Sequence, residues 1–298
     1  MIIDIHAHTS DRRLNGLYTD NAKIHYLRWQ AEILGISKIC LMATYFPLKL
    51  SGLPNKAILE RIKGDDLFLC FGSLDMENNW LGGLNELIEL AESKQIAGIK
   101  LYPGYQNIVL SDPTYAPLFA LAAKYGLPVA CHLGELHHCC PSAERNQLNF
   151  RCGQKTCLLD DEKRRYLAHP DQLALVAQNF PEVNFIACHL ANPYFSDLRR
   201  AMAVLPNIYS DISGQFLSGT AEDSPAYRRE LIGEIKLFLD LPSGADRIMF
   251  GSDFPIQSQE DSLSIIEALD LSPADKEKIL HRNAEKILNL KLSLKPKL

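Results

Sequence analysis

The sequence lacks a long apolar run, and it lacks a clear excess of either charge. No stretch approaches the roughly 18 consecutive apolar residues of a membrane-spanning helix. The 31 basic and 36 acidic residues give a net charge of −5, and no basic patch stands out that would attract nucleic-acid phosphates. We therefore expect no membrane and no nucleic acid among its partners, whereas a small-molecule substrate and a homo-oligomer both fit this composition.

The amino-terminal residues lack the features of a secretory signal. Met1–Ile5 has no basic region, and neither a long apolar core nor a small-residue cleavage site follows it. Eight cysteines would suit a disulfide framework in a short secreted chain, but this chain has 298 residues. Cys40, Cys70, Cys131 and Cys188 each lie in or beside a short apolar run. We expect them to be reduced core residues of a cytoplasmic protein.

What the sequence does contain is a regular alternation of short apolar runs and longer segments with helical spacing. Eight runs rich in β-branched residues are predicted strands: Ile2–Ile5, Lys38–Ala43, Phe68–Leu74, Ala97–Leu101, Pro128–Cys131, Asn184–Cys188, Ile208–Ile212 and Arg247–Phe250. Predicted helices between them include Asn21–Leu34, Leu81–Ala91, Tyr115–Tyr125, Asp171–Asn179 and Glu230–Leu239. Because each helix returns the chain to the same edge of the sheet, the strands should pair in parallel.

Eight such units within 298 residues predict an α/β fold, a single (β/α)8 TIM-barrel domain over residues 1–298. The main rival is a doubly wound open sheet, but no Gly-rich phosphate loop follows the first strand to support it. A further helix is predicted over Ser272–Leu290, with Ser272 as N-cap ahead of Pro273. Almost forty residues without a clean period follow His132, and we expect an irregular, Cys-containing insertion there.

Polar residues that end the predicted strands are the candidate site residues, because the carboxyl ends of barrel strands form the catalytic face. His6 and His8 end the first strand two positions apart, so both can face the barrel axis and hold one metal ion. His132 ends the fifth strand, His189 the sixth and Asp253 the eighth. Any one of these alone is typical of a solvated strand end, but in a barrel all five converge on one point.

These motifs resemble those of the amidohydrolase superfamily, and within it the amidohydrolase-2 group, which also contains metal-dependent decarboxylases. The resemblance spans nearly the whole chain. It rests on Asp4-Ile5-His6-Ala7-His8, Gly98-Ile99-Lys100-Leu101-Tyr102-Pro103, Cys131-His132, Ala168-His169-Pro170, Cys188-His189, Gly251-Ser252-Asp253-Phe254-Pro255 and Asn283-Ala284-Glu285-Lys286-Ile287-Leu288.

The resemblance implies that His6, His8, His132 and Asp253 bind one divalent metal, for which zinc is the expected ion and manganese an alternative. It also implies that His189 orients or polarises the reacting carbonyl, and that Asp253 takes the proton as water attacks. Such a ligand set leaves an open position for water, whose pKa a zinc-like ion lowers to about 7.

Lys100 has two interpretations. Many members of the superfamily carry a carbamylated lysine at the fourth strand that bridges two metals, although a single metal is more usual in this group. Alternatively, Lys100 is a protonated lysine at the rim that binds a substrate carboxylate. Arg12 and His169 are further candidates for substrate binding, and Asp211 and Glu135 are candidates for the support of an imidazole.

The insertion departs from the family pattern because it contains Cys139, Cys140, Cys152 and Cys157. Four cysteines this close together could hold a second, structural zinc, but their spacing is not that of a standard ribbon or finger. Reduced thiols or one incidental disulfide are the simpler interpretation.

The resemblance implies hydrolysis of a C–N or C–O bond in a small, carboxylated amide, lactone or ester. The alternative is a lyase that decarboxylates an aromatic or unsaturated acid without an oxidant. The metal residues cannot separate the two, since both reactions need a polarised oxygen and a proton relay. A third hypothesis, a non-catalytic metal-binding barrel, is disfavoured by the intact set of metal-binding residues.

Overall fold

The computed structural model describes residues 1–10, 22–45, 52–136 and 162–290. Eight parallel strands pair in chain order, which confirms all eight predicted strands to within a few residues. They are β1 (Ile3–Ala7), β2 (Lys38–Met42), β3 (Phe68–Gly72), β4 (Gly98–Leu101), β5 (Val129–Cys131), β6 (Phe185–Ala187), β7 (Ile208–Asp211) and β8 (Ile248–Met249).

The sheet closes between its first and last strands. Ile5 N donates to Phe250 O at 3.1 Å, and His8 N donates to Phe254 O at 2.7 Å. A parallel bridge also joins Ala7 to Phe254, just beyond β8. Closure without a free edge is the geometry of a (β/α)8 barrel, so the barrel prediction is confirmed and the open doubly wound sheet is excluded.

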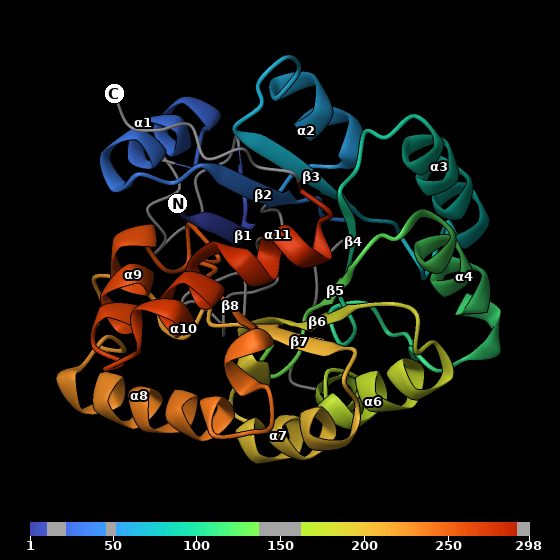
Figure 1. The fold of residues 1–298 in the computed structure, drawn as a ribbon. Helices are drawn as coiled ribbons and strands as arrows, with labels where there is room; N and C mark the ends of the chain where they lie inside the picture. The colour runs from blue at the N-terminus through green and yellow to red at the C-terminus, as the bar shows by residue number, and fades with distance from the viewer. Residues whose placement is uncertain (11–21, 46–51, 137–161, 291–298) are drawn as a thin grey trace, which may run out of the picture.

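The helices form an outer ring around the strands (Figure 1). They are α1 (Ile24–Leu34), α2 (Asn55–Arg61), α3 (Trp80–Glu92), α4 (Ala116–Tyr125), α5 (Glu162–Leu167), α6 (Pro170–Asn179), α7 (Phe195–Val204), α8 (Pro225–Leu239) and α9 (Gln259–Glu267). The α8 helix begins five residues before the predicted start, because the Ser224 side chain accepts from Tyr227 N and Pro225 sits at the first helical position.

Only part of the predicted insertion after β5 lies within the described residues. Its described end forms α5, so the stretch is not irregular throughout. Cys139, Cys140, Cys152 and Cys157 lie outside the described residues, and so does Arg12.

The carboxyl-terminal segment begins at its predicted cap, where the Ser272 side chain accepts from Asp275 N at 3.1 Å. It consists of α10 (Pro273–Glu277), a π-helical turn over Lys278–Arg282 and α11 (Asn283–Ile287). The segment crosses the amino-terminal end of the barrel (Figure 1), where Asn283 Nδ2 donates to Ala245 O at 2.8 Å and to Ile248 O at 2.7 Å, at the start of β8. This end of the barrel is therefore covered, and the opposite mouth carries the polar residues.

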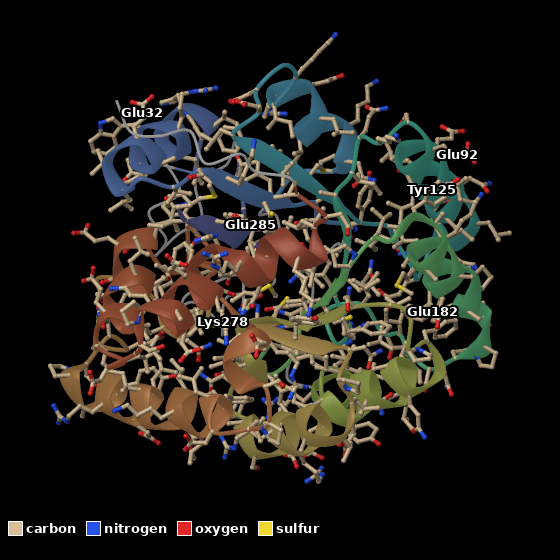
Figure 2. All side chains as sticks on the ribbon, in the orientation of Figure 1. Glu32, Glu92, Tyr125, Glu182, Lys278 and Glu285 are labelled. Carbon is tan, nitrogen blue, oxygen red and sulfur yellow. The ribbon has the colours of Figure 1, made fainter. Side chains whose placement is uncertain are left out.

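Apolar side chains fill the amino-terminal part of the barrel interior and pack there against α11. One buried cluster combines Ile3, Ile5, Phe71, Ile186 and Met249 from the strands with Ala284 and Ile287 from α11. The outer helix faces carry charged side chains instead, as Figure 2 shows for the exposed Glu32 of α1 and Glu92 of α3.

Cys40, Cys70, Cys131 and Cys188 are buried and free, which confirms that these four are core residues outside any disulfide. Among the described residues, no helix has the length and apolar character needed to cross a membrane.

Candidate metal centre

The first strand brings His6 and His8 to the carboxyl-terminal mouth of the barrel. The register of β1 against β2 shifts between Asp4 and Ala7. The two imidazole centroids lie 5.4 Å apart. The His6 side chain is fully buried, whereas that of His8 is 19% exposed. The pair thus combines one fully buried imidazole with one imidazole that a substrate or water can approach.

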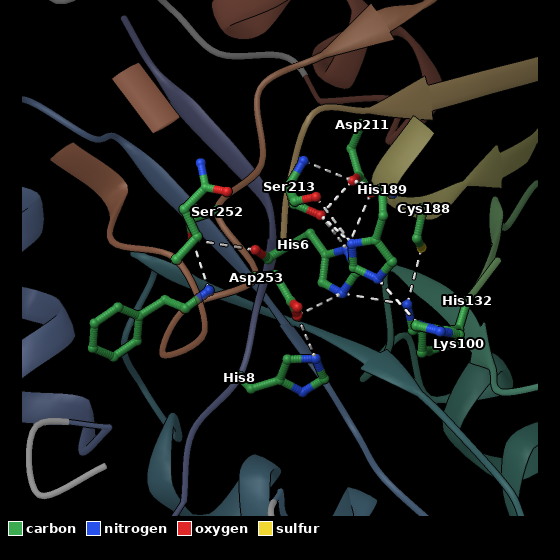
Figure 3. A network of polar contacts seen from close by, with 12 residues as sticks. His6, His8, Lys100, His132, Cys188, His189, Asp211, Ser213, Ser252 and Asp253 are labelled. Carbon is green, nitrogen blue, oxygen red and sulfur yellow. Dashed lines mark hydrogen bonds and ion pairs between the residues drawn. The ribbon is translucent and has the colours of Figure 1, made fainter. Parts of the chain in front are cut away.

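Asp253 joins the two histidines from the segment that follows β8. Its Oδ1 lies 3.4 Å from His6 Nε2 and 3.1 Å from His8 Nε2. One ligand atom from each of the three residues lies within 4.8 Å of the other two. Figure 3 shows the three side chains turned toward one another. The structure therefore gathers three of the four predicted metal ligands into one compact group.

The backbone at this centre is strained where it presents its side chains. Asp253 has a φ of 59° and His189 a φ of 63°, both in the left-handed region that non-glycine residues seldom occupy. Gly214 allows the close approach between them, since a Cβ there would lie 2.7 Å from Asp253 Oδ2 and 2.7 Å from His189 Nδ1. The fold therefore holds both side chains in unusual backbone conformations, as functional sites often do.

His132 and His189 form the other half of the centre. His189 Nε2 lies 3.1 Å from His132 Nδ1, and His189 also packs against His6 with ring centroids 4.9 Å apart. His132 thus reaches the group of His6, His8 and Asp253 through His189. The structure brings all five predicted strand-end residues together, with His132 at the edge of the cluster.

Asp211 supports two of these histidines from the end of β7. Its Oδ2 lies 3.0 Å from His6 Nδ1, and its Oδ1 accepts from His189 N at 3.0 Å and from the Ser213 hydroxyl. Burial alone raises the pKa of Asp211, but its interactions with the His6 imidazole outweigh burial and hold that pKa well below its ordinary value. Asp211 is therefore a carboxylate that fixes the ring of His6. Glu135, the other residue expected to support an imidazole, contacts His132 through its backbone oxygen, at 3.0 Å from Nε2.

The hydrogen-bond partners of three imidazoles also fix which nitrogen carries the proton. His6 Nδ1 faces the Asp211 carboxylate, His132 Nε2 faces a carbonyl oxygen, and His189 Nδ1 lies 3.1 Å from Ser213 O. Carboxylates and carbonyl oxygens accept hydrogen bonds, so each neutral ring carries its proton on that nitrogen and a lone pair on the other. Those lone pairs belong to His6 Nε2, His132 Nδ1 and His189 Nε2. His6 and His132 belong to the predicted ligand set, and imidazole nitrogens together with the Asp253 carboxylate are donors of the kind that bind a divalent metal.

The protonation states at the centre suit the same ligand set. Burial lowers the pKa of His8 to about 4 and that of His189 to about 3, so both rings are neutral at neutral pH. Burial raises the pKa of Asp253, but the imidazole of His189 and the hydrogen bond from His8 outweigh it and hold that pKa well below its ordinary value. Neutral imidazoles and an ionised carboxylate are the forms that bind a metal ion.

Asp4 lies behind this centre and was not singled out from the sequence. Its Oδ1 accepts from Ser252 N at 3.0 Å and from His6 N at 3.2 Å, and its Oδ2 accepts from Ser252 Oγ and Gln259 Nε2 at 2.7 Å each. Burial raises the pKa of Asp4 to about 6, although these hydrogen bonds lower it. Asp4 thus ties His6 to the residue before Asp253. The sequence feature that could have identified Asp4 is an acidic residue inside an otherwise apolar predicted strand.

Lys100 differs from the expectation that it reaches the rim. It is fully buried, and its Nζ lies 3.3 Å from His6 Nε2 and 2.9 Å from Cys188 Sγ (Figure 3). Its side chain points into the barrel because alternate strand residues face opposite sides of the sheet. Cys188, a core residue in the sequence prediction, is therefore also part of the centre.

His169 lies apart from this cluster. It caps the amino end of α6, where its Nδ1 accepts from Asp171 N at 3.3 Å. Its Nε2 lies 3.4 Å from Asp197 Oδ2, and its ring packs against Tyr194 at 4.6 Å. The structure thus gives His169 a place in the packing of α6 and α7, and its role in substrate binding stays a prediction.

Comparisons with known proteins bear on this site and its barrel. A family model described as amidohydrolase matches residues 48–290, and none of the curated protein sequences matches the chain. An uncharacterised TIM-barrel protein from Bordetella bronchiseptica is similar in structure, with a TM-score of 0.70, 18% identity and coverage of 97% of this chain and 98% of that one.

Two further solved structures have printed activities. A probable 2-pyrone-4,6-dicarboxylic acid hydrolase from Acinetobacter baumannii, with citric acid bound, has a TM-score of 0.66 and 14% identity, over 97% of this chain and 99% of that one. A dihydroxybenzoic acid decarboxylase from Polaromonas, with bound manganese and an inhibitor, 2-nitroresorcinol, has a TM-score of 0.66 and 15% identity, over 98% of each chain. At these identities the likeness establishes the fold.

Proposed function

The chain belongs to the amidohydrolase family, and we propose that it is a metal-dependent hydrolase that cleaves a C–N or C–O bond in a small, carboxylated amide, lactone or ester. The observation that carries this proposal is the group of His6, His8 and Asp253, whose donor atoms lie within 4.8 Å of one another at the carboxyl-terminal mouth of the barrel. That mouth is where enzymes of this fold carry their chemistry.

In this proposal His6, His8, His132 and Asp253 would hold one divalent ion, zinc or manganese. When bound, the ion would supply a Lewis-acid position that lowers the pKa of water to about 7. The protein's contribution is to place imidazole nitrogens and the Asp253 carboxylate at the same mouth of the barrel, with Asp211 orienting His6 through its Nδ1 at 3.0 Å.

Asp253 would accept the proton of the attacking water. Its carboxylate is ionised, and its Oδ1 is turned toward His6 and His8. Its other oxygen, Oδ2, borders Gly214 on the side where His189 Nδ1 lies. An ionised carboxylate within reach of the water can take its proton. Because its pKa is low, it can pass that proton on to the leaving group.

His189 would act next to the reacting carbonyl. Its Nδ1 proton faces Ser213 O at 3.1 Å, and burial keeps the ring neutral. The remaining nitrogen, Nε2, therefore accepts a hydrogen bond, which favours a role in orienting the water or a substrate N–H or O–H group. Polarisation of the carbonyl by His189 would require a second proton on the ring.

Decarboxylation is the second candidate function, and the similar structures include a decarboxylase as well as a hydrolase. The same residues serve either reaction, because both need a polarised oxygen and a group that moves a proton. The two functions differ in the product, since a decarboxylase releases carbon dioxide and a hydrolase takes up water.

The test is a substrate panel on chelator-treated protein that has been reloaded with zinc or manganese. The panel should contain lactones, esters, amides and dihydroxybenzoic acids, with carbon dioxide release measured beside hydrolysis. We expect metal-dependent hydrolysis that disappears in Asp253→Asn. Carbon dioxide release without hydrolysis would favour the lyase, and a protein that binds no metal would refute the proposal.

A further inference from the structure

The helix at the described end of the insertion, α5, packs against the loop that follows β4. Arg164 of α5 has a side chain that is only 12% exposed, and its Nη1 donates to Gly104 O at 3.2 Å and to Tyr105 O at 2.9 Å. Its Nη2 lies 3.7 Å from Glu77 Oε1, so a carboxylate offsets the charge of the guanidinium. A guanidinium presents its N–H donors in a rigid planar arrangement. Arg164 therefore holds two successive carbonyl groups of this loop.

The loop that Arg164 holds carries Tyr105, whose ring packs on the imidazole of His132. The two ring centroids lie 4.7 Å apart, and Tyr105 is 1% exposed. Gly104 allows α5 to approach this closely, since it has a φ of 87° and a Cβ there would lie 2.8 Å from Arg164 O. The contact from α5 to His132 thus runs through a buried aromatic ring.

A second contact joins the same segment to the backbone beside His132. Gly134 N donates at 2.9 Å to the oxygen of Ala168, the residue that follows α5. Glu135 is the next residue, and its backbone oxygen lies 3.0 Å from His132 Nε2. The segment that includes α5 therefore meets His132 in two ways, on its ring through Tyr105 and on its backbone through Gly134.

We propose that Arg164 is a positioning residue of the metal centre: it fixes the backbone at Tyr105, and the Tyr105 ring fixes the imidazole of His132. The inference rests on the proposed function, in which His132 is a metal ligand. Support matters at His132 because this residue lies at the edge of the cluster, where His189 Nε2 lies 3.1 Å from its Nδ1. Groups that orient a ligating imidazole change metal affinity by about 10- to 100-fold when they are removed.

The loss of the guanidinium should move the loop without unfolding it. Gly104 and Tyr105 are buried, and a buried carbonyl that loses its donor is costly, so their backbone should shift toward water. Gln106 would still hold the following residue, because its Nε2 donates to Leu74 O at 3.0 Å and to Tyr45 O at 3.2 Å. The expected result is a folded protein in which the Tyr105 ring no longer presses on His132.

The test is the affinity of the metal-free, full-length protein for Zn²⁺, measured by competition with a chromophoric chelator. Arg164→Ala should bind the ion about tenfold more weakly than the wild type. Arg164→Lys keeps a cationic N–H donor at this position and should recover most of the lost affinity. Arg165→Ala is the matched control, because Arg165 is the exposed neighbour on the same helix, and it should bind like the wild type. Circular dichroism shows whether each variant is folded.

A double-mutant cycle tests the route through Tyr105. Tyr105→Leu removes the ring and should weaken Zn²⁺ binding to a similar extent. Arg164→Ala should then add little to Tyr105→Leu, because the two substitutions remove the same support of His132. Independent residues would instead give losses that multiply.

The outcomes separate this inference from the proposed function. Wild-type affinity in a folded Arg164→Ala protein would overturn the inference alone, and so would losses that multiply in the cycle or an equal loss in Arg165→Ala. Arg164→Met, which keeps the apolar stem, replaces Arg164→Ala with the same expectation if that variant does not fold. A wild type that binds no metal would refute the proposed function, and this inference with it.

Discussion

The two ends of the barrel use the same eight strands for opposite purposes. At the amino end, α11 packs Ala284 and Ile287 into an apolar interior. At the carboxyl end, the strands finish in buried imidazoles and carboxylates whose partners are other polar groups of the chain. Apolar burial at one end stabilises the fold, so that the other end can keep charged groups in strained backbone. The comparison predicts that substitutions at one end change stability and those at the other change chemistry.

Asp253→Asn should have the largest effect on activity and a small effect on stability. The amide keeps the shape of the side chain but cannot take a proton. We expect turnover to fall by about two to four orders of magnitude, which is the usual contribution of a positioned general base. Steady-state kinetics on the metal-loaded protein checks this. A variant with nearly wild-type turnover would remove Asp253 from the mechanism.

Ile287→Ala should show the reverse pattern at the amino end. Ile287 is 1% exposed, and truncation of a buried isoleucine to alanine costs about 2–5 kcal/mol of unfolding free energy. We expect lower resistance to urea, with metal stoichiometry unchanged. Loss of metal from the folded variant would show that the two ends are coupled, against the division drawn above.

Asp4 lies between the two ends of the barrel, and Asp4→Asn should change how the stability of the protein depends on pH. The pKa of Asp4 is raised to about 6 in the folded protein, above its ordinary value of about 4. The folded state therefore holds this proton more tightly than the unfolded state, and the contribution of Asp4 is most favourable below pH 4.

As the pH rises from about 4 to about 6, the wild type should lose about 3 kcal/mol of stability relative to Asp4→Asn. Urea unfolding of both proteins across this range measures the difference. A difference that does not change with pH would contradict the raised pKa.

Arg282→Ala should have the smallest effect. Arg282 pairs with Glu277 at 2.6 Å, but both side chains are more than half exposed. Exposed ion pairs contribute little to stability, because water and salt screen them. We expect unfolding midpoints close to the wild type. A large loss would mean that α10 and α11 hold the barrel through surface charge and not through the apolar contacts of Ile287.

Much of the fold could be predicted because strand and helix signals are local. Apolar runs rich in β-branched residues placed all eight strands, and Ser272 marked the start of the last helical segment. The strand ends were less precise: β8 stops at Met249, where the predicted run continues to Phe250, because Phe250 N donates to Ile279 O and not to a neighbouring strand.

The site could be predicted in part for a different reason. Imidazole and carboxylate groups bind metal ions when they lie close together, so the residue types of His6, His8 and Asp253 indicate a metal site. The topology of a barrel brings the carboxyl ends of its strands together. Which way a side chain points depends on register, so the burial of Lys100 against Cys188 could not be read from the motif. Asp4 was missed because its partners, Ser252 and Gln259, lie far away in the sequence and next to it in space.

The most direct test of the metal centre is the stoichiometry of zinc in the wild type and in a His6→Ala, His8→Ala double variant. Both proteins should be stripped with chelator, reloaded and analysed for bound metal, with circular dichroism to show that each is folded. The account predicts close to one equivalent in the wild type and a sharp loss in the double variant, because the remaining ligands cannot complete the site. Full occupancy in the folded double variant would contradict it.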